Sequence, residues 1–313
     1  MQKPIVVVGS INLDLVVSAL RIPNIGETII GDNFNTFSGG KGANQAVAVA
    51  KLGYPVSMVG NVGNDSFGAQ LLHGLIQAGV DTTYVSAVEG PSGVALITTN
   101  AQGENTIVVV PGANGQLTPQ KLEGAQPLLE AAGILLAQLE IPLESIDYLA
   151  ELAERLNIPF ILDPAPAREL SAEILVRTSW LTPNQTEAKQ LLRLDTNAYT
   201  ADEYYAADRL LALGVKNVLM KLGSHGCLVA QSGVPQHRLP AYPVKAVDST
   251  AAGDAFNGAF AVALMRGLTP VQSATFASAV AAISVTRLGA QPSMPTSDEV
   301  KSFLVSQAAV IPV

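Results

Sequence analysis

The sequence contains little cysteine and little histidine, and both shortages exclude classes of protein. Cys227 is the single cysteine in 313 residues, so no internal disulfide can form, and a cytoplasmic location is the default expectation. The three histidines, His73, His225 and His237, do not have the spacing of zinc ligands, and no Gly-x-Ser-x-Gly motif is present. These absences argue against a disulfide scaffold, a zinc enzyme and a serine hydrolase.

Positive charge and long apolar runs are also scarce. Lys and Arg number 18 against 26 Asp and Glu, a net charge of -8, and the basic residues form no cluster that would bind nucleic acid. Polar residues interrupt the apolar stretches 259–265 and 277–285 well short of the roughly 18 residues of a membrane span. The run Ile5 to Val8 is too short for a signal peptide. We therefore expect a soluble protein without a membrane or nucleic-acid partner.

The residues that are present suit one large α/β domain. Short apolar runs alternate with helical patterns, which predicts a mainly parallel sheet with helices on both faces and ligands at the carboxyl ends of its strands. No repeat or linker divides the chain, so we expect a single domain over 1–313. The expected strands are 56–59, 134–137, 159–162, 180–181, 218–220 and 227–230, and the clearest helices are 143–156 and 204–213.

Two pairs of segments interrupt this alternation. Residues 12–18 with 28–37, and 93–99 with 105–110, have the pattern of paired strands, and the turn-like Asn100-Ala-Gln-Gly103 joins the second pair. Extended chain inserted between the βα units is a candidate lid, which we assign to about 12–37 and 92–111.

The stretch Asp248-Ser-Thr-Ala-Ala-Gly-Asp254 is the strongest functional signal. The helical spacing of the apolar residues that follow predicts a helix whose first turn is Ala252, Gly253 and Asp254. Unpaired N–H groups and the helix dipole make such a turn an anion site, and Gly253 lets an anion approach the backbone. Beside that anion, Asp254 is a natural general base for a hydroxyl that attacks a phosphoryl group, as in a small-molecule kinase. Taken alone, the motif is weak and favours an acid that simply caps or charges a helix N-terminus, so its functional reading depends on the other segments.

A second signal is Ser38-Gly-Gly-Lys41-Gly-Ala-Asn44, which precedes an Ala/Val helix. It lacks the glycine spacing and the Ser or Thr of a Walker A loop. Its three glycines with Lys41 and Asn44 suit a polyhydroxylated ligand that lies against bare backbone, although a glycine turn with a solvated lysine is the alternative. Upstream, Asn12 and Asp14 project to one face of an extended segment, where they could bind hydroxyls, or they belong to a turn.

The third signal is Leu181-Thr-Pro-Asn184-Gln-Thr-Glu187. Thr182 as N-cap, Pro183 at the first helical position and Gln185 after it predict a capped helix. This reading leaves Asn184 and Glu187 free to hold the water shell of Mg²⁺ or a phosphate oxygen.

Two further segments complete the candidate site. Lys221-Leu-Gly-Ser-His-Gly226 is either a glycine-rich hairpin or a wall of a nucleotide site, and Glu140 follows a strand, where it could meet a ligand or lie in a solvated loop.

Together these segments resemble the ribokinase family of sugar kinases, and within it the ribokinase branch. The likeness covers nearly the whole chain. Its motifs, in order, are Gly9-Ser-Ile-Asn-Leu-Asp14, Gly39-Gly-Lys-Gly-Ala-Asn44-Gln, Pro164-Ala-Pro-Ala-Arg168, Thr182-Pro-Asn-Gln-Thr-Glu187, Ala251-Ala-Gly-Asp254 and Arg287-Leu-Gly-Ala-Gln-Pro-Ser293.

The resemblance implies phosphorylation of D-ribose at its 5-hydroxyl by ATP. It implies a doubly wound α/β core with a small β lid through which two copies form a homodimer. It also implies Mg²⁺, held near Asn184 and by Glu187 through water, with Asp254 as base and an anion hole at Ala252 and Gly253. The sugar would be held by Asn12, Asp14, Gly40, Lys41, Asn44, Glu140 and Asp254, and the nucleotide would contact Asn184, Glu187, Lys221, Gly223, Ser224, Gly226, Gly253 and Ser278.

The resemblance further implies a monovalent cation, K⁺, beside the anion hole. Its matching positions are Asp248, Thr250, Ser284, Arg287, Gly289 and Ser293. The chain departs from common family residues at Ala251, where many members have Gly, at Ser278, where close relatives often have His, and at Lys221, which replaces a small polar residue.

Two other hypotheses remain open from the sequence. One is a kinase of the same fold for another sugar or a nucleoside, although the low aromatic content of 5% disfavours a base-stacking pocket. The other is a non-catalytic sugar- or nucleotide-binding regulator, against which the joint presence of Asp254, Gly253, Asn184 and Glu187 argues.

Overall fold

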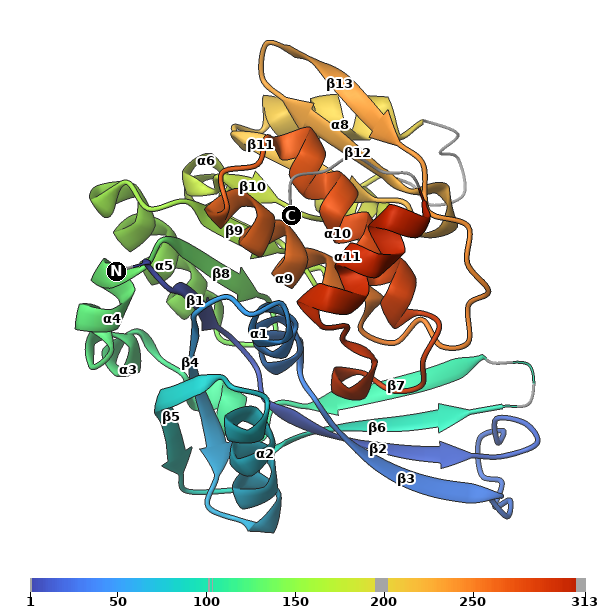
Figure 1. Cartoon of the computed structure of the whole chain (residues 1–313). Coiled ribbons are helices and arrows are strands. Elements are labelled where there is room, and N and C mark those ends of the chain that lie inside the picture. The colour runs from blue at the N-terminus through green and yellow to red at the C-terminus, as the bar shows by residue number, and fades with distance from the viewer. Residues whose placement is uncertain (1, 101, 103, 195–201, 308–313) are drawn as a thin grey trace.

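The strands of the chain form a large sheet and a small one. The structure is a computed structural model that describes residues 2–100, 102, 104–194 and 202–307. Within these residues the large sheet has nine strands in the order β13-β12-β11-β10-β9-β8-β1-β4-β5 (Figure 1). Its strands are β1 (Ile5–Val8), β4 (Val56–Gly63), β5 (Asp81–Val88), β8 (Ile134–Gln138), β9 (Phe160–Asp163), β10 (Trp180–Leu181), β11 (Asn217–Lys221), β12 (Cys227–Gln231) and β13 (Val234–Leu239).

The central strand β1 shows why helices cover both faces of this sheet. All four of its residues are buried, with Ile5 and Val7 in one hydrophobic cluster and Val6 and Val8 in another. Alternate side chains of a strand point to opposite faces, so both faces need an apolar cover. One cover consists of α1 (Lys41–Lys51), α2 (Ser66–Gln77), α9 (Ala252–Met265), α10 (Pro270–Ser284) and α11 (Ser297–Ser306). The other consists of α3 (Pro119–Glu123), α4 (Gln126–Ala131), α5 (Leu143–Leu156), α6 (Ala172–Arg177), α7 (Gln185–Leu191) and α8 (Glu203–Ala212).

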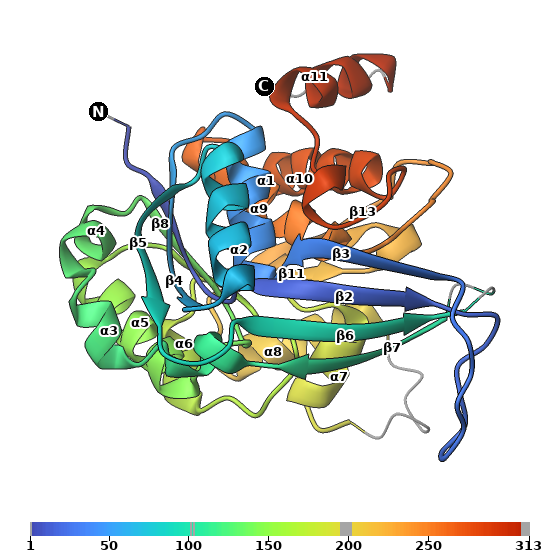
Figure 2. The ribbon, with the colours of Figure 1, turned by 90° about the horizontal axis from the view of Figure 1, so that it is seen from below.

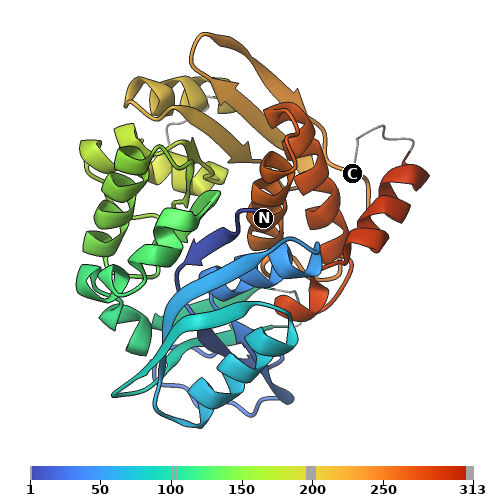
Figure 3. The ribbon, with the colours of Figure 1, turned by 60° about the vertical axis from the view of Figure 1, so that its left-hand side comes forward.

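The two helical layers lie on opposite sides of the sheet (Figure 3). In the spatial order of the large sheet, the neighbouring strands β11, β10, β9, β8, β1, β4 and β5 run parallel. At the other edge, β12 is antiparallel to β11 and β13 is antiparallel to β12. The predicted doubly wound α/β class is therefore confirmed, although β5 and β13 were not anticipated. Among the described helices, none has the length and apolar character needed to cross a bilayer.

The connections of β1 locate the binding edge of the sheet. From β1 the chain proceeds to β4 on one side, and later returns to β8 on the other side. Reversal of the strand order at such a point opens a crevice at the carboxyl ends of the two strands. The ends of β1 and β8 are therefore where a ligand site is expected.

The small sheet projects to one side of the large sheet (Figure 2). Its order is β3-β2-β6-β7, with β2 (Asn12–Ser18) parallel to β6 (Gly93–Thr99), and β3 (Asn33–Gly39) and β7 (Asn105–Val110) antiparallel to their neighbours. The two predicted strand pairs are present, but β3 begins at residue 33 rather than 28, because its partner β2 ends at Ser18. Of the predicted turn 100–103, Ala101 and Gly103 lie outside the described residues.

Candidate active site

The crevice between β1 and β8 brings together residues that are far apart in the sequence. The Ser10 hydroxyl, after β1, donates to Glu140 Oε2 at 2.5 Å, and the Lys41 backbone N–H donates to the same oxygen at 3.2 Å. Glu140 is thus a strand-end carboxylate at the switch point, as predicted, and it ties the end of β1 to the start of α1.

The glycines that precede α1 make room for the protein itself. A Cβ on Gly39 would lie 2.2 Å from Asp14 Oδ2, and one on Gly42 would lie 2.7 Å from the backbone carbon of Gly9. Gly40, with φ of 87°, would place a Cβ 2.6 Å from the Asn12 N atom. The glycine density therefore reflects close packing of this turn on β1 and β2, whereas the sequence suggested bare backbone for a ligand.

Asn12 and Asp14 are both buried on the same face of β2, which agrees with their predicted projection. Asn12 Oδ1 accepts a hydrogen bond of 2.6 Å from Asn114 Nδ2, and Asn114 also bonds both backbone groups of Ile11. Asn114 was not anticipated, because nothing in the local sequence shows that its turn packs on β2. These hydrogen bonds of Asn114 fix the position at which β2, and with it the small sheet, begins.

Asp254 lies in the first turn of α9, with 6% of its surface exposed. Its Oδ2 accepts from Asn44 Nδ2 and its Oδ1 from Gln45 Nε2, both at 3.0 Å. Burial raises the pKa of Asp254 to about 6, while Lys41 and the two amide donors act in the opposite direction. A carboxylate with such a pKa is ionised at neutral pH and still basic enough to accept a proton.

The neighbouring charges are strongly coupled. Burial raises the pKa of Asp14 to about 7, and the negative charges of Glu140 and Asp254 add to this, against the effect of Lys41. Burial lowers the pKa of Lys41, but the carboxylates of Asp254, Glu140 and Asp163 outweigh it, so the net shift is upward. Lys41 is therefore the cation that neutralises this carboxylate group.

In the first turn of α9, the backbone amides of Gly253 and Asp254 have no acceptor among the described residues. Ala251, with φ of 58°, is in the left-handed region, and its side chain does not cap the helix. The Ala252 N–H donates to Ser249 O at 3.2 Å, whereas the Gly253 N–H has no acceptor among the described residues. Of the two amides predicted for the anion hole, Gly253 is thus available and Ala252 is engaged in a turn.

A buried polar cluster lies next to this turn. Asp163, at the end of β9, forms a 2.8 Å ion pair with Lys221 Nζ through Oδ1, and its Oδ2 accepts from Gln45 Nε2 at 3.0 Å. Gln138 Nε2 donates to Gln45 Oε1 at 2.7 Å and so fixes the orientation of that amide. Asp163 was not predicted as a site residue, although it is an acid at a strand end like Glu140. Gln45 and Gln138 were not assigned a role from the sequence either.

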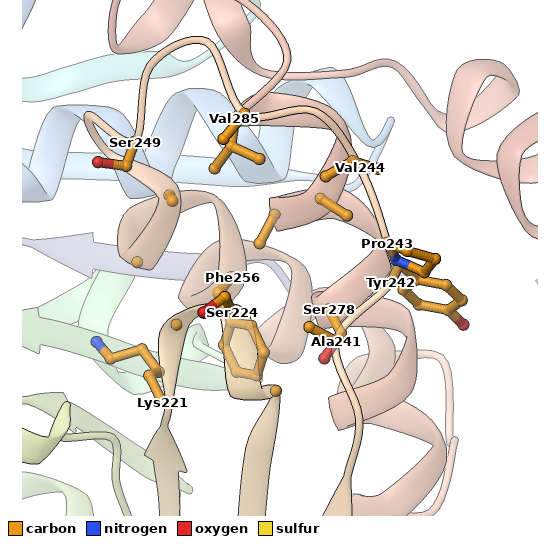
Figure 4. Close-up of a pocket in the computed structure, with 17 residues that line it drawn as sticks. Lys221, Ser224, Ala241, Tyr242, Pro243, Val244, Ser249, Phe256, Ser278 and Val285 are labelled. Atoms are coloured by element: carbon orange, nitrogen blue, oxygen red, sulfur yellow. The ribbon is translucent and has the colours of Figure 1, made fainter.

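A cavity of about 520 Å³ adjoins the first turn of α9. Lys221 and Tyr242 lie at opposite ends of it, with Phe256 between them (Figure 4). Apolar residues form most of the wall, which is typical of a pocket for a nucleotide base. The lining includes the predicted nucleotide residues Lys221, Gly223, Ser224, Gly226, Gly253 and Ser278, together with Ala252 and the unpredicted Phe256, Tyr242, Val244, Ala282 and Val285.

The predicted capping of α7 was wrong by two residues. The N-cap is Asn184, whose Oδ1 accepts from the Glu187 N–H at 2.9 Å while Glu187 Oε2 accepts from the Asn184 N–H at 2.7 Å. The helix starts late because Pro183 O accepts from Lys221 N at 2.8 Å, which keeps the chain extended beside β11. Asn184 and Glu187 therefore form the capping box itself, and they lie outside the described lining of the cavity. Burial raises the pKa of Glu187, with Lys221 opposing.

The predicted cation residues lie in the turn before α9 and in the segment from the last residue of α10, Ser284, to Ser293, and Asp248 joins the two. Asp248 Oδ1 accepts from the Thr250 N–H at 2.9 Å and Oδ2 from the Gly289 N–H at 2.8 Å. The Ser284 and Ser293 hydroxyls donate to backbone carbonyls, Ala281 O and Ala290 O. The Arg287 side chain pairs instead with Glu299 of α11, at 2.7 Å, and so takes no direct part in the loop contacts.

The chain is similar to known carbohydrate kinases over nearly its whole length. Residues 2–297 match the pfkB family carbohydrate kinase pattern. The chain is 42% identical over 304 residues to the ribokinase of Bacillus subtilis, which covers 97% of this chain and 100% of the relative. It is 36% identical to a deoxyribokinase of Salmonella typhimurium, over 96% of this chain and 98% of the relative. The structure of Arabidopsis thaliana ribokinase in complex with ribose and ATP superimposes with a TM-score of 0.90, at 37% identity and over 97% of this chain and 99% of that one. The protein described here belongs to the pfkB family of carbohydrate kinases.

Proposed function

We propose that the protein transfers the γ-phosphoryl group of ATP to the 5-hydroxyl of D-ribose. The observation that carries this proposal is the position of Asp254, a buried carboxylate in the first turn of α9 between the acceptor crevice and the cavity. Similarity to the ribokinase of B. subtilis, and to a ribokinase that binds ribose and ATP, supports the choice of acceptor and donor.

The acceptor crevice has the groups that a sugar requires. Asn12, Asp14, Asn44 and Glu140 offer amides and carboxylates, and Lys41 offers a cation. Asn12 and Asp14 lie at the start of β2, Glu140 follows β8, and Lys41 and Asn44 lie in the first turn of α1. The Asn44 Oδ1 atom is buried without a hydrogen-bond partner among the described residues. A buried acceptor without a partner is costly unless a ligand satisfies it, and a sugar hydroxyl would do so.

Asp254 would accept the proton of the sugar hydroxyl while that oxygen forms its bond to the γ-phosphorus and the bond to the ADP oxygen breaks. The two amide donors, Asn44 and Gln45, hold the carboxylate in one orientation for this transfer. The free Gly253 N–H, at the positive end of α9, would stabilise the charge on the transferring phosphoryl oxygens. The Ala252 N–H contributes only after it leaves the Ser249 carbonyl.

Mg²⁺ would accompany the nucleotide. Among the described residues there is no group of three or more His, Cys, Asp or Glu that could hold a metal ion, and Mg²⁺ commonly keeps several waters and binds substrate phosphates. Each Glu187 oxygen accepts a hydrogen bond from Asn184 and has a further lone pair for a metal-bound water. The residues therefore fit an indirect contact of Glu187 with a nucleotide-bound ion.

We place the K⁺ site on the loops joined by Asp248. Its carboxylate links the 248–250 turn to Gly289, and hydrogen bonds from Thr250 and Gly289 outweigh burial to lower the pKa of Asp248, so the group is anionic. A cation held there by loop oxygens would stabilise the turn that presents the anion hole.

The small sheet would serve as lid and as dimer interface. The strand registers place Asn12 and Asp14 on one face and Val17, Phe34, Leu96 and Val108 on the other. The latter four are 37% to 61% exposed, which is unusual for a group of large apolar side chains. Docking of this face on the same face of a second copy would bury it.

A coupled assay of ADP formation tests the proposal. D-ribose, 2-deoxy-D-ribose, other pentoses, hexoses and nucleosides are compared with ATP and Mg²⁺, with and without K⁺. We expect the highest kcat/KM for D-ribose and a higher rate with K⁺. Absence of sugar-dependent ADP formation would refute the kinase assignment, and a higher kcat/KM for another acceptor would refute ribose.

2-Deoxy-D-ribose is the second candidate acceptor. The deoxyribokinase of S. typhimurium is nearly as similar to this chain as several ribokinases. The two pentoses differ by one hydroxyl, and a site that hydrogen-bonds this hydroxyl rejects the analogue that lacks it. The same assay decides between them.

A further inference from the structure

Lys221 lies where the nucleotide cavity meets the buried polar cluster. It ends β11, lines the cavity and forms the 2.8 Å ion pair with Asp163. The ammonium nitrogen lies 3.5 Å from the position that a Cβ would occupy on Gly253. The ammonium therefore lies beside the first turn of α9, on the side of Gly253.

This position is electrostatically unfavourable for a lysine without an anion. The N-terminal end of a helix carries partial positive charge, which repels a cation. Only 13% of the Lys221 side chain and 2% of the Asp163 side chain are exposed, so water screens and solvates the ammonium poorly. Asp163 offsets this cost in the nucleotide-free protein through a direct ion pair, and the nearby carboxylate of Glu187 adds a weaker attraction.

Asp163 satisfies the ammonium only in part. An ammonium has three hydrogens to donate, and among the described residues Asp163 is the one hydrogen-bond acceptor recorded for Lys221 Nζ. The second Asp163 oxygen accepts from Gln45, so this carboxylate is shared. The remaining donors of Lys221 lie at the boundary of a cavity that ends at the anion-binding turn.

We propose that Lys221 binds the terminal phosphates of the nucleotide, and that Asp163 holds the ammonium in place until they arrive. The inference rests on the proposed kinase function and adds a charged group to the Gly253 amide at the same site. A phosphate oxygen between Lys221 Nζ and the Gly253 N–H would receive one charge-assisted bond and one from the helix terminus. The lysine at this position thus takes part in nucleotide binding rather than only filling a buried ion pair.

Equilibrium binding of ATP and of adenosine to the full chain separates these two roles. Adenosine has the base and ribose of the nucleotide but no phosphates, so Lys221 contributes nothing to its affinity. The variants are D163N, the double variant D163N/K221Q, and K221R, each checked for thermal unfolding. The double variant removes both charges of the ion pair together, so Asp163 is not left as a buried carboxylate without its partner.

We expect D163N/K221Q to bind ATP about 10- to 100-fold more weakly than D163N, the usual value of a hydrogen bond to a charged group, with equal affinity for adenosine. D163N keeps the ammonium and removes its competitor, so it should bind ATP at least as tightly as the natural chain. K221R keeps the charge and should retain most of the ATP affinity.

Equal ATP affinity of D163N and D163N/K221Q would overturn the proposal, because the lysine would then serve only to neutralise Asp163. A parallel loss of adenosine affinity would overturn it as well, since the cavity itself would have changed. Failure of the kinase assignment appears separately, as absence of sugar-dependent ADP formation by the natural chain.

Discussion

Asp254 and Asn44 are joined by a 3.0 Å hydrogen bond between residues 210 positions apart in the chain. The bond connects the first turn of α9 to the first turn of α1, and therefore connects the proposed phosphoryl site to the proposed sugar site. In the proposed mechanism Asn44 would have two tasks, to orient the carboxylate of Asp254 with its Nδ2 and to accept a hydrogen bond from the substrate with its unpartnered Oδ1.

Replacement of Asp254 by Asn tests the base directly. Asn has nearly the same shape but does not accept the proton, so kcat should fall on the order of 10² to 10⁴, the usual value of general-base catalysis. Steady-state ADP formation with ribose measures this, and thermal unfolding checks the fold. Unchanged kcat in a folded Asp254→Asn protein would remove the residue from the mechanism.

The activity should depend on pH through the same group. Burial raises the pKa of Asp254 to about 6, and only the ionised form accepts a proton. We expect kcat/KM to rise with pH through about 6 and to level off above it. The profile belongs to interacting carboxylates, so its midpoint is an apparent value. A flat profile from pH 5 to pH 8 would contradict this expectation.

The free energy of unfolding should fall as pH rises, in contrast to the activity, which should increase. Burial first, and then Glu140 and Asp254, raise the pKa of Asp14 from 3.8 to about 7, so between these values the folded state binds more protons than the unfolded state. The contribution of Asp14 to stability is complete below pH 4 and is lost as pH rises through about 7. The urea midpoint should therefore fall from pH 5 to pH 8, and it should fall less in Asp14→Asn. Equal slopes in the two proteins would show that Asp14 is not responsible.

Two substitutions of Glu187 separate its part in the capping box of α7 from its proposed contact with Mg²⁺. Glu187→Gln keeps a side chain that can complete the capping box with Asn184, whereas Glu187→Ala removes that contact. We expect Ala to cost about 1 kcal/mol of unfolding free energy, as lost caps do, and Gln to cost little. Both should raise the Mg²⁺ concentration needed for half-maximal rate. An unchanged Mg²⁺ requirement in Glu187→Gln would exclude the metal contact.

Alanine substitutions of Gly39 and Gly74 form a matched pair of variants, one beside the proposed sugar site and one on α2. A Cβ on Gly39 would overlap the Asp14 carboxylate, whereas a Cβ on Gly74 of α2 would meet only the Ser38 hydroxyl at 3.6 Å. Gly39→Ala should therefore displace Asp14 and raise KM for ribose. Gly74→Ala should leave KM unchanged and add about 0.5–1 kcal/mol of helix stability. Similar KM values for the two variants would disprove the role of Gly39.

Lysine substitutions on the small sheet test the proposed dimer interface. Phe34→Lys and Val108→Lys place a cation on the apolar outer face of the small sheet, where both residues are about three-fifths exposed. Light scattering should then detect monomers, whereas the natural chain and a control, Val234→Lys on β13, should be dimers. A monomeric natural chain would refute the interface.

Local pattern and spacing were enough to predict much of the fold and part of the site. The helix Leu143–Leu156 was predicted correctly because its apolar stripe follows the helical period, and so was the position of Asp254 in the first turn of α9, because residues with the same period follow it. Asp163, Gln138 and Asn114 could not be assigned in this way. Their partners lie on strands or turns that are neighbours only in space, and the order of strands in a sheet is not written in any one segment.

The start of α7 illustrates a different failure. Thr182 and Pro183 are good helix-starting residues, but a backbone bond from Lys221 of β11 holds Pro183 in an extended path. A long-range contact thus overrides local preference by two residues, and it changes Asn184 from a free ligand candidate into a cap.

The two faces of β2 carry opposite chemistries within seven residues, with Asn12 and Asp14 on one side and Leu13, Leu15 and Val17 on the other. Side chains in a strand alternate with a period of two, so insertion or deletion of a single residue before Asn12 would exchange the faces completely. The carboxylate of Asp14 and the amide of Asn12 would then lie on the apolar face, and leucines would face the proposed sugar site. The register of β2 against β3 and β6 therefore decides which chemistry each face of the small sheet carries.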